Sequence, residues 1–349
     1  MLSTNDYDVI NASLEQHNKA IIGIGCSFVA GMGAWHPEIF QDFSVTVDEA
    51  AGNRCVIRDP SEVTAVKEKY KIASGPPSDN NLNWSAYEKD NAFVDVLANK
   101  YLTDHTPINL GMSGNGNRSS ASQLFLHPQI NWDKIQGGAI VYCPSGMDRF
   151  DFANDQGIDY GHSHICTWPG GSERVRRGHF TRDDLSGAYG NIIYSEKSAV
   201  IEQLVTVQTI TMFAKMHNMQ LIITPGFDER YSSEEFTQFI LEKIDRDAKG
   251  RRIANEYDMP ASQKHRLLEL VKLFPWDNVF KPDGQETFID LCLKQEGLPP
   301  STNCSYFFGY LHKGSPNHWV SPCAHPTALG HDLFAHHLFN AINRGGYNV

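Results

Sequence analysis

Residues 20–33 read AIIGIGCSFVAGMG, and this stretch decides the fold of the chain. Its first half is a short run of apolar residues and glycine, which is typical of a strand buried on both faces of a parallel sheet. The run ends in Gly25, Cys26 and Ser27, so a serine flanked by small residues stands at the turn after the strand. We therefore expect Ser27 at the carboxyl end of a central strand, where open α/β sheets bind their ligands.

Three further segments share this character and predict parallel strands: residues 106–110, 138–143 and 219–224. Helical patterns follow over residues 92–101, 195–218, 262–273, 286–295 and 327–342. Strands that alternate with helices favour an α/β fold with right-handed crossovers. The sequence therefore predicts a three-layer sandwich around a central, mostly parallel sheet.

Three long stretches interrupt this alternation. Residues 36–90 are polar, residues 150–193 are rich in glycine, histidine and arginine, and residues 226–261 are charged. Connections in compact α/β domains are usually far shorter, so we interpret the three stretches as long loop insertions. Since no internal repeat is visible, we expect residues 1–349 to form a single domain.

Composition narrows the class of protein. The chain is 41% apolar and 11% aromatic, which is ample for a large core. A formal charge of -11 and the lack of a strong basic patch argue against a nucleic-acid partner. The N-terminus lacks the pattern of a signal peptide, and no apolar run reaches the ~18 residues of a membrane span. The seven cysteines are scattered singly, so we expect reduced thiols, a cytoplasmic location and no contact with membranes.

A second glycine-rich turn follows the predicted strand 106–110. Residues 109–117 read NLGMSGNGN, a loop whose backbone can approach a ligand closely. If a helix starts near Asn117, free N–H groups of this loop point to where an oxyanion would form. The alternative is a tight strand-to-helix turn with asparagine at positive φ.

Two more segments complete a set that we expect to meet at one edge of the sheet. Residues 142–149 read YCPSGMDR after the third strand, and residues 325–331 read HPTALGH. In the last segment His325 precedes a proline that suits the first position of a helix. A serine and a histidine are the nucleophile and base of many hydrolases. Taken alone, Ser27 is better explained as a turn residue or a helix N-cap, and His325 as a simple cap, than as catalytic groups.

In this order the blocks resemble those of the SGNH (GDSL-like) hydrolases. Residues 25–28 are similar to the nucleophile block, residues 109–114 to the second block and residues 325–331 to the block of the base histidine. The resemblance implies the flavodoxin-like SGNH fold, with Ser27 as nucleophile and His325 as general base acting through an acyl-enzyme. It also implies that the backbone N–H groups of Ser27 and Gly114 hold the oxyanion.

The chain departs from this family at two positions. Met147 stands where the family has an asparagine that donates to the oxyanion, and Ser145 in the same turn is the expected substitute. Pro322 stands where the family has an acid three residues before the histidine. A carbonyl, for instance that of Ser321 or Pro322, would then orient the imidazole and leave a Ser–His dyad.

Together with these residues, the resemblance implies a serine-dependent esterase or carbohydrate O-deacetylase that acts on an ester-bearing small molecule or an O-acetylated carbohydrate. The alternative is a non-catalytic structural or glycan-binding protein of the same fold. The Gly-Cys-Ser variant of the first block resembles the SGNH-like proteins of marine bacteriophages. That resemblance implies a location in the virion. The partners would then be other virion proteins or further copies of this chain.

We expect neither a cofactor nor a metal. His162, His164, Cys166 and later His179 invite a zinc site, yet the second ligand pair that structural zinc sites normally show is incomplete. A nucleotide-binding protein is disfavoured as well, because no G-x-G-x-x-G motif opens the first helix and no P-loop lysine is present.

Overall fold

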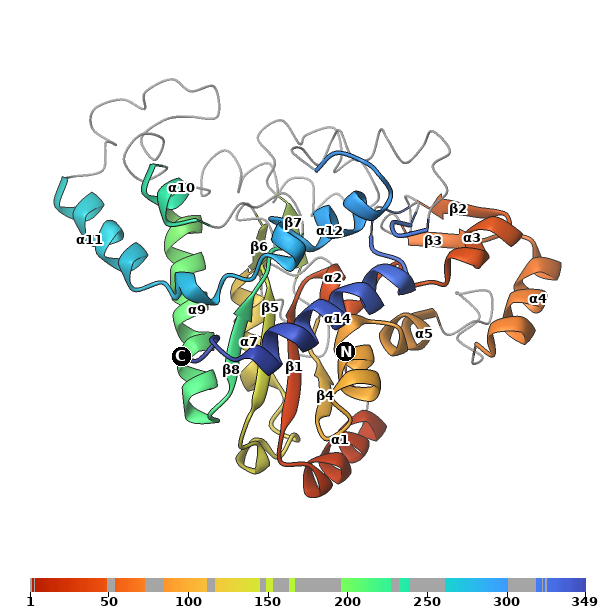
Figure 1. Cartoon of the computed structure of the whole chain (residues 1–349), viewed down its shortest axis with the longest axis horizontal. Helices are drawn as coiled ribbons and strands as arrows, with labels where there is room; N and C mark the ends of the chain where they lie inside the picture. The colour runs from red at the N-terminus through yellow and green to blue at the C-terminus, as the bar shows by residue number, and fades with distance from the viewer. Residues whose placement is uncertain are drawn as a thin grey trace.

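Figure 1 shows the chain as a computed structural model. It describes residues 2, 4–48, 54–72, 84–111, 117–144, 149–152, 163–166, 196–226, 232–238, 261–300, 318–321, 323 and 325–349. The four predicted strands are all present: β1 (Ala20–Gly25), β4 (Thr106–Asn109), β5 (Gly138–Cys143) and β8 (Gln220–Ile223). They form one parallel sheet in the order β4-β1-β5-β8, which confirms the predicted fold class (Figure 1).

Strand β1 lies between β4 and β5. After β1 the chain first adds β4 on one side of this strand and later adds β5 on its other side. Gly23 pairs with Asn109 of β4, and Gly25 pairs with Cys143 of β5. Because the strands are parallel, the segments after β1, β4 and β5 leave from the same edge of the sheet. A crevice outside the carboxyl ends at such a switch point is the usual ligand site of an open α/β sheet.

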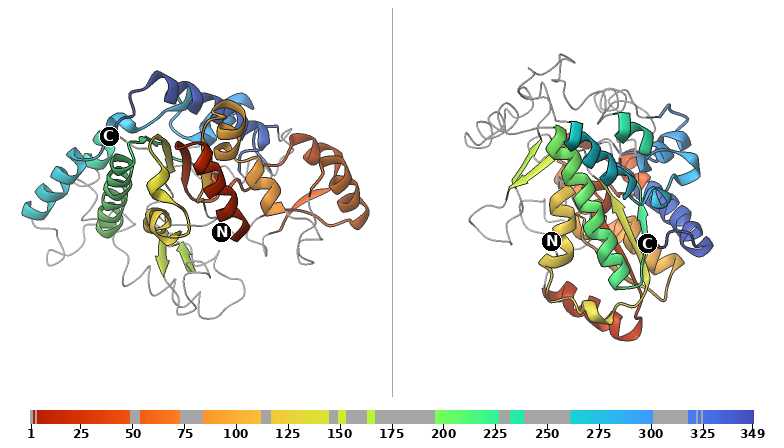
Figure 2. Two further views of the ribbon diagram at one scale, coloured as in Figure 1. Left: turned by 90° about the horizontal axis from the view of Figure 1, so that it is seen from below. Right: turned by 90° about the vertical axis from the view of Figure 1, so that its left-hand side faces the viewer.

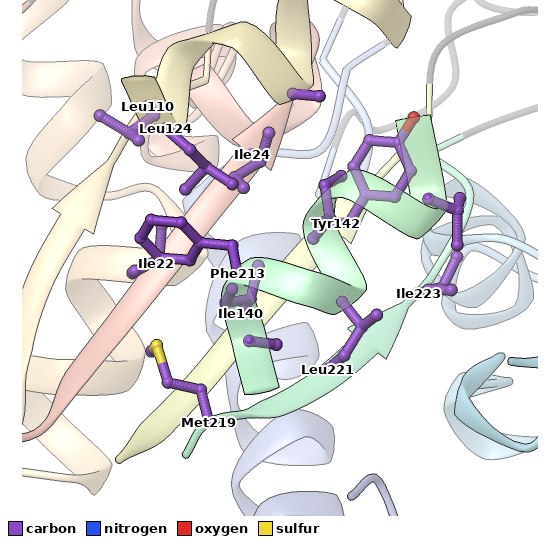
Figure 3. Close-up of a cluster of buried hydrophobic side chains, with 14 of the residues drawn as sticks. Ile22, Ile24, Leu110, Leu124, Ile140, Tyr142, Phe213, Met219, Leu221 and Ile223 are labelled. Atoms are coloured by element: carbon purple, nitrogen blue, oxygen red, sulfur yellow. The ribbon is translucent and has the colours of Figure 1, made fainter. Parts of the chain in front are cut away.

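Successive side chains of the strands face opposite layers, which is why each strand is apolar throughout. On one face Ile22, Ile24, Ile140 and Tyr142 pack against helices (Figure 3). These helices are α1 (Thr4–Gln16), α7 (Asn117–Leu126), α9 (Glu196–Met216) and α11 (Ala261–Lys272). Tyr142 is fully buried there and receives a 3.4 Å hydrogen bond from Gln203 of α9.

On the other face Ile21, Val141 and Ile222 meet a second helical layer, seen on the opposite side of the sheet in Figure 2. It consists of α6 (Phe93–Val96), the π-helix η2 (Leu97–Tyr101), α12 (Phe288–Gln295) and α14 (Ala328–Arg344). The helix predicted over residues 92–101 is therefore present, but its second half is wound as a π-helix. The two layers and the sheet make up the three-layer sandwich.

Residues 36–90, predicted as an insertion, contain secondary structure of their own beyond the β4 edge (Figure 1). Their elements are α3 (Pro37–Asp42), β2 (Val45–Asp48), β3 (Arg54–Ile57), α4 (Pro60–Tyr70) and α5 (Trp84–Asp90). They enclose a small cluster of buried side chains, here called the satellite core: Trp35, Ile39, Cys55, Ile57, Val63, Val66, Ile72 and Cys323. Strands β2 and β3 pair as an antiparallel hairpin.

The other two predicted insertions lie largely outside the described residues. Within them the structure gives the hairpin of β6 (Arg149–Phe152) and β7 (Ser163–Cys166), and the short helix α10 (Ser233–Gln238). Three 3₁₀ turns complete the described elements: η3 (Trp132–Lys134), η8 (Trp276–Asn278) and η9 (Pro282–Gly284). Among the described helices, none is both long enough and apolar enough to cross a bilayer.

Candidate active site

Ser27 is the first residue of the short helix α2 (Ser27–Ala30), which begins where β1 ends (Figure 1). Cys26 is the N-cap and has extended backbone angles. Gly25 has φ of +150°, and a Cβ there would lie 2.3 Å from the Cys143 carbonyl oxygen, so only glycine fits. The tight turn presents Ser27 at the strand end with only 5% of its surface exposed.

His325 lies in a tight loop before α14, here called the base loop (described residues 318–321, 323 and 325–327). Val320 and Pro326 form an antiparallel bridge, and the Ser321 N–H donates to the His325 carbonyl at 2.7 Å. The expected position of Pro326 at the start of the helix is wrong. Helix α14 begins at Ala328, because the Thr327 side chain accepts a hydrogen bond from the Gly330 N–H and so acts as the N-cap.

The structure brings the side chains of Ser27 and His325 together. Nε2 of His325 lies 2.7 Å from Ser27 Oγ, and Nδ1 lies 2.8 Å from the Cys323 carbonyl oxygen. A carbonyl oxygen only accepts hydrogen bonds, so Nδ1 must carry the proton of the neutral ring. Nε2 then presents its lone pair to the Ser27 hydroxyl, which is the arrangement a general base needs.

The carbonyl that orients the imidazole belongs to Cys323, neither to Ser321 nor to Pro322 as the sequence suggested; Pro322 itself lies outside the described residues. Ser321 has a different task, because its hydroxyl donates to the His325 carbonyl at 2.9 Å and closes the base loop. The ring of Phe28 supports the imidazole from the side, with the ring centroids 5.0 Å apart.

Gly33 lets the base loop approach the segment after α2. Its φ is +80°, and a Cβ there would lie 2.6 Å from Ser321 Oγ and 2.9 Å from His325 Cβ. The buried carboxylate of Glu88 holds this segment, since it accepts hydrogen bonds from the Gly33 N–H and the Trp35 Nε1–H, both at 3.0 Å. Neither Gly33 nor Glu88 was identified from the sequence.

The second glycine-rich turn begins directly against α2. Asn109 Nδ2 donates to the Val29 carbonyl at 2.9 Å, while its Oδ1 accepts from the Gly111 N–H at 3.0 Å. Gly111 lies so close that a Cβ would stand 2.3 Å from the Ala30 nitrogen. The expected oxyanion residue Gly114 lies outside the described residues.

The turn after β5 is also incompletely described. Its first residue, Pro144, is buried behind the strand end. The expected donor Ser145 and the methionine at position 147 lie outside the described residues, so their roles remain predictions.

A buried carboxyl group that sequence analysis missed lies behind these contacts. Asp95 of α6 is 8% exposed and interacts with the Asn109 side chain, and its Oδ2 has no hydrogen-bond partner among the described residues. Burial raises the pKa of Asp95 to about 7, and the charge of Lys89 opposes this only in part. The signal for this residue was a lone acid within an otherwise apolar helical segment.

His331, the second histidine of the last block, plays a packing role. It is fully buried, and its Nδ1 accepts the Phe93 N–H at 3.1 Å, which joins α14 to the start of α6. Burial lowers the pKa of His331 to about 3, so the ring is neutral at physiological pH.

The histidine- and cysteine-rich insertion is only partly described. His162 and His179 lie outside the described residues, and the backbone of His164 and Cys166 belongs to β7. Within the described part of the chain no group of three or more His, Cys, Asp or Glu side chains is placed to hold a metal ion.

Comparison with known proteins adds little to the site. No family model matches the chain. No curated protein matches its sequence. Among solved structures, one chain described by the words "The active site of a carbohydrate esterase displays divergent catalytic and non-catalytic binding functions" is 15% identical, with a TM-score of 0.38. That alignment covers 94% of this chain and 66% of the other, so this chain spans just under two thirds of its length.

A second solved structure is 10% identical with a TM-score of 0.33, and the alignment covers 93% of this chain and 97% of the other. Superpositions this loose carry no argument about activity. The function is therefore inferred from the residues of this chain alone.

Proposed function

We propose that the protein is a serine-dependent acyl hydrolase that uses Ser27 and His325 as a dyad. The observation that carries this proposal is the pair of hydrogen bonds made by the His325 ring, 2.7 Å to Ser27 Oγ and 2.8 Å to the Cys323 carbonyl. A serine that only capped a helix would need no imidazole beside it. Here a half-buried imidazole is held in the tautomer that can accept the proton of the serine hydroxyl.

The reaction runs through two acyl transfers. His325 Nε2 takes the Ser27 proton as Oγ attacks the ester carbonyl, and the resulting imidazolium returns that proton to the leaving alkoxide. A water molecule then enters, loses a proton to Nε2 and attacks the acyl carbonyl; the imidazolium returns that proton to Ser27 Oγ as the carboxylic acid leaves. The Cys323 carbonyl keeps the ring in one orientation through both steps by accepting the Nδ1 proton.

The oxyanion needs preorganised donors near Ser27. As first residue of α2, Ser27 has a backbone N–H that the helix itself does not use. We assign the other donors to the Gly114 N–H and the Ser145 hydroxyl, because their turns follow the two strands that flank β1. Each such donor typically lowers the barrier by about 3 kcal/mol.

The substrate class we propose is an ester-bearing small molecule, with an O-acetylated carbohydrate as the natural example. The first test is hydrolysis of 4-nitrophenyl acetate by the wild type, Ser27→Ala and His325→Gln. We expect the alanine variant to fall to the uncatalysed rate and the glutamine variant to lose roughly 100-fold, the usual contribution of a general base. Ser262→Ala, which alters an exposed serine on α11, is the matched control and should keep full activity.

A second experiment does not depend on the choice of substrate. An aryl organophosphonate should add covalently to Ser27, as peptide mass mapping would show, and should label His325→Gln roughly 100-fold more slowly. Equal, negligible rates in the wild type and Ser27→Ala, together with no phosphonate adduct, would refute the hydrolase.

That outcome favours the alternative, a non-catalytic glycan-binding or structural protein of the same fold. The observation in its favour is the uncharged carbonyl at Nδ1, which stabilises an imidazolium less than a carboxylate does. A virion location, with other virion proteins or further copies of this chain as partners, belongs to this alternative. Binding of O-acetylated glycans by Ser27→Ala at wild-type affinity without turnover by either protein would support it.

A further inference from the structure

Two cysteines from distant parts of the sequence meet behind the base loop. Cys55 is in strand β3, is 5% exposed and pairs across the hairpin with Val47. Cys323 is in the base loop and is 1% exposed. Both belong to the satellite core, both are free thiols, and their side chains interact with each other.

Cys323 is also the residue that orients the proposed base. Its carbonyl accepts the His325 Nδ1 proton at 2.8 Å, and its Sγ lies 3.1 Å from Ser321 Oγ. Gly33 packs closely against the same residue, since a Cβ there would stand 3.2 Å from the sulfur. The sulfur and the orienting carbonyl therefore share one tightly packed residue, and the sulfur cannot move far without the carbonyl.

The two thiols differ in acidity. The contact with Cys55 lowers the pKa of Cys323 against the effect of burial, whereas the same contact and burial raise the pKa of Cys55. Thiolates, not thiols, attack oxidants and disulfides. Cys323 is thus the more reactive sulfur, and Cys55 is placed to resolve its oxidised form.

We propose that Cys55 and Cys323 form a reversible disulfide that switches off the dyad; the effect on activity rests on the proposed function, whereas the formation of the disulfide does not. The oxidant is a hydroperoxide. The Cys323 thiolate attacks its O–O bond to give a sulfenic acid and release the other oxygen as alcohol or water. Cys55 then attacks the sulfenic sulfur and expels water, so two thiols are oxidised, one peroxide is reduced and one S–S bond forms.

Oxidation changes the geometry on which His325 depends. A disulfide brings the sulfurs to about 2.05 Å, far closer than hydrogen-bonded thiols. Cys323 must move toward β3, which withdraws its carbonyl from Nδ1 and frees the ring to rotate away from Ser27. Because both sulfurs are buried, the oxidant gains access through local opening of the satellite core.

The test uses the full chain, first reduced with dithiothreitol and then treated with hydrogen peroxide. Non-reducing peptide mass mapping should find a peptide pair linked through Cys55 and Cys323. Hydrolysis of 4-nitrophenyl acetate should fall by roughly 100-fold, the contribution of a general base, and recover on reduction. Cys55→Ser should keep its activity under peroxide, while the matched control Cys292→Ser, another buried cysteine, should lose activity as the wild type does.

A second readout separates this inference from the hydrolase proposal. Carbethoxylation of His325 by diethyl pyrocarbonate, followed by mass spectrometry, should be faster in the disulfide form, whether or not the protein hydrolyses esters. Absence of the linked peptide overturns the modification site. A linked peptide with unchanged His325 reactivity and unchanged hydrolysis overturns the coupling to the dyad.

Discussion

At the residue scale, Nδ1 of His325 donates its proton to the backbone carbonyl of Cys323. In Ser-His-Asp triads the acceptor at this position is a charged carboxylate. A carbonyl selects the tautomer and the ring orientation as well as a carboxylate does. In the proposed reaction it offers no net charge to the imidazolium that would form as Ser27 attacks. The proposed dyad should therefore work at a lower rate than a full triad, and it should depend on the loop that carries Cys323.

Asp95 provides the first prediction. Its pKa is about 7 in the folded protein, above the ordinary value of 3.8, so the folded state binds the proton more tightly than the unfolded chain. The stability this provides is fully present below about pH 4 and is lost as the pH rises through 7. Asp6 and Asp90 add to the effect of burial, and Lys89 opposes it. The loss should amount to about 4 kcal/mol at pH 8.

Asp95→Asn keeps the shape of the side chain and removes this titration. Urea unfolding between pH 4 and pH 8 should show the wild type losing stability relative to the variant as the pH rises. Asp133→Asn, an exposed acid on η3, is the matched control and should follow the wild type. Parallel curves for the wild type and Asp95→Asn would contradict the raised pKa.

The geometry of the site explains why the sequence analysis identified some of its residues and missed others. Ser27 and His325 stand in motifs whose residue types are chemically distinctive, and the structure brings their side chains together. The acceptor at Nδ1 is a main-chain carbonyl, which any residue can supply, so no motif marks Cys323. Gly33 and Glu88 act through close approach and burial, and these arise only when distant segments meet.

At the scale of elements, the close approach of the base loop to the segment after α2 yields a second prediction. Gly33→Ala combines a strained positive φ with a Cβ that meets Ser321 and His325. Gly297→Ala is the matched control, because its φ of +72° is similar but nothing lies within 4 Å of the added Cβ. The strain alone costs about 1 kcal/mol in both.

The free energy of unfolding in urea should fall by a further 1–3 kcal/mol or so in Gly33→Ala, the usual cost of overpacking. Its hydrolysis of 4-nitrophenyl acetate should fall too, because the displaced base loop carries His325. Equal losses of stability in the two variants would mean that the base loop does not rest on Gly33.

The N-cap of α14 gives a third prediction. Thr327 caps the helix that follows the base loop and also donates to the His318 carbonyl, whereas Thr287 caps α12, which carries no proposed catalytic residue. Thr327→Ala and Thr287→Ala should each lose about 1 kcal/mol of stability. Only Thr327→Ala should also lower kcat/KM, and Thr327→Ser should restore both quantities. An equal effect of both alanine variants on kcat/KM would show that the cap does not position His325.

At the scale of the whole molecule, the sandwich could be predicted because its strands are buried on both faces and read as continuous apolar runs. Tyr142 and Ile140 face one layer while Val141 faces the other, and all three had to be compatible with a core. The satellite core was not predicted because the sequence patterns of its strands are only a few residues long. Alternation in VTVD at residues 45–48 and RCVI at residues 54–57 indicates strands only once the two are paired.

Two buried groups among the described residues change the stability of the fold with pH in opposite directions. The pKa of His331 is lowered to about 3 from an ordinary value of 6.5, so the stability from its neutral form is present above pH 6.5 and is lost as the pH falls toward 3. Asp95 loses stability as the pH rises over nearly the same range. Their slopes are each about 1.4 kcal/mol per pH unit and of opposite sign, so they cancel between roughly pH 4 and pH 6.5.

Each single variant should therefore expose the slope of the other group. Asp95→Asn should lose stability steeply on acidification from pH 6.5 to pH 4, because protonation of buried His331 is no longer balanced. His331→Asn, whose amide oxygen can still accept the Phe93 N–H, should instead gain stability over that interval. Urea unfolding at half-unit pH steps measures both slopes. If the double variant is not flatter than either single variant, the two groups do not set the pH profile of the fold, and other buried groups must.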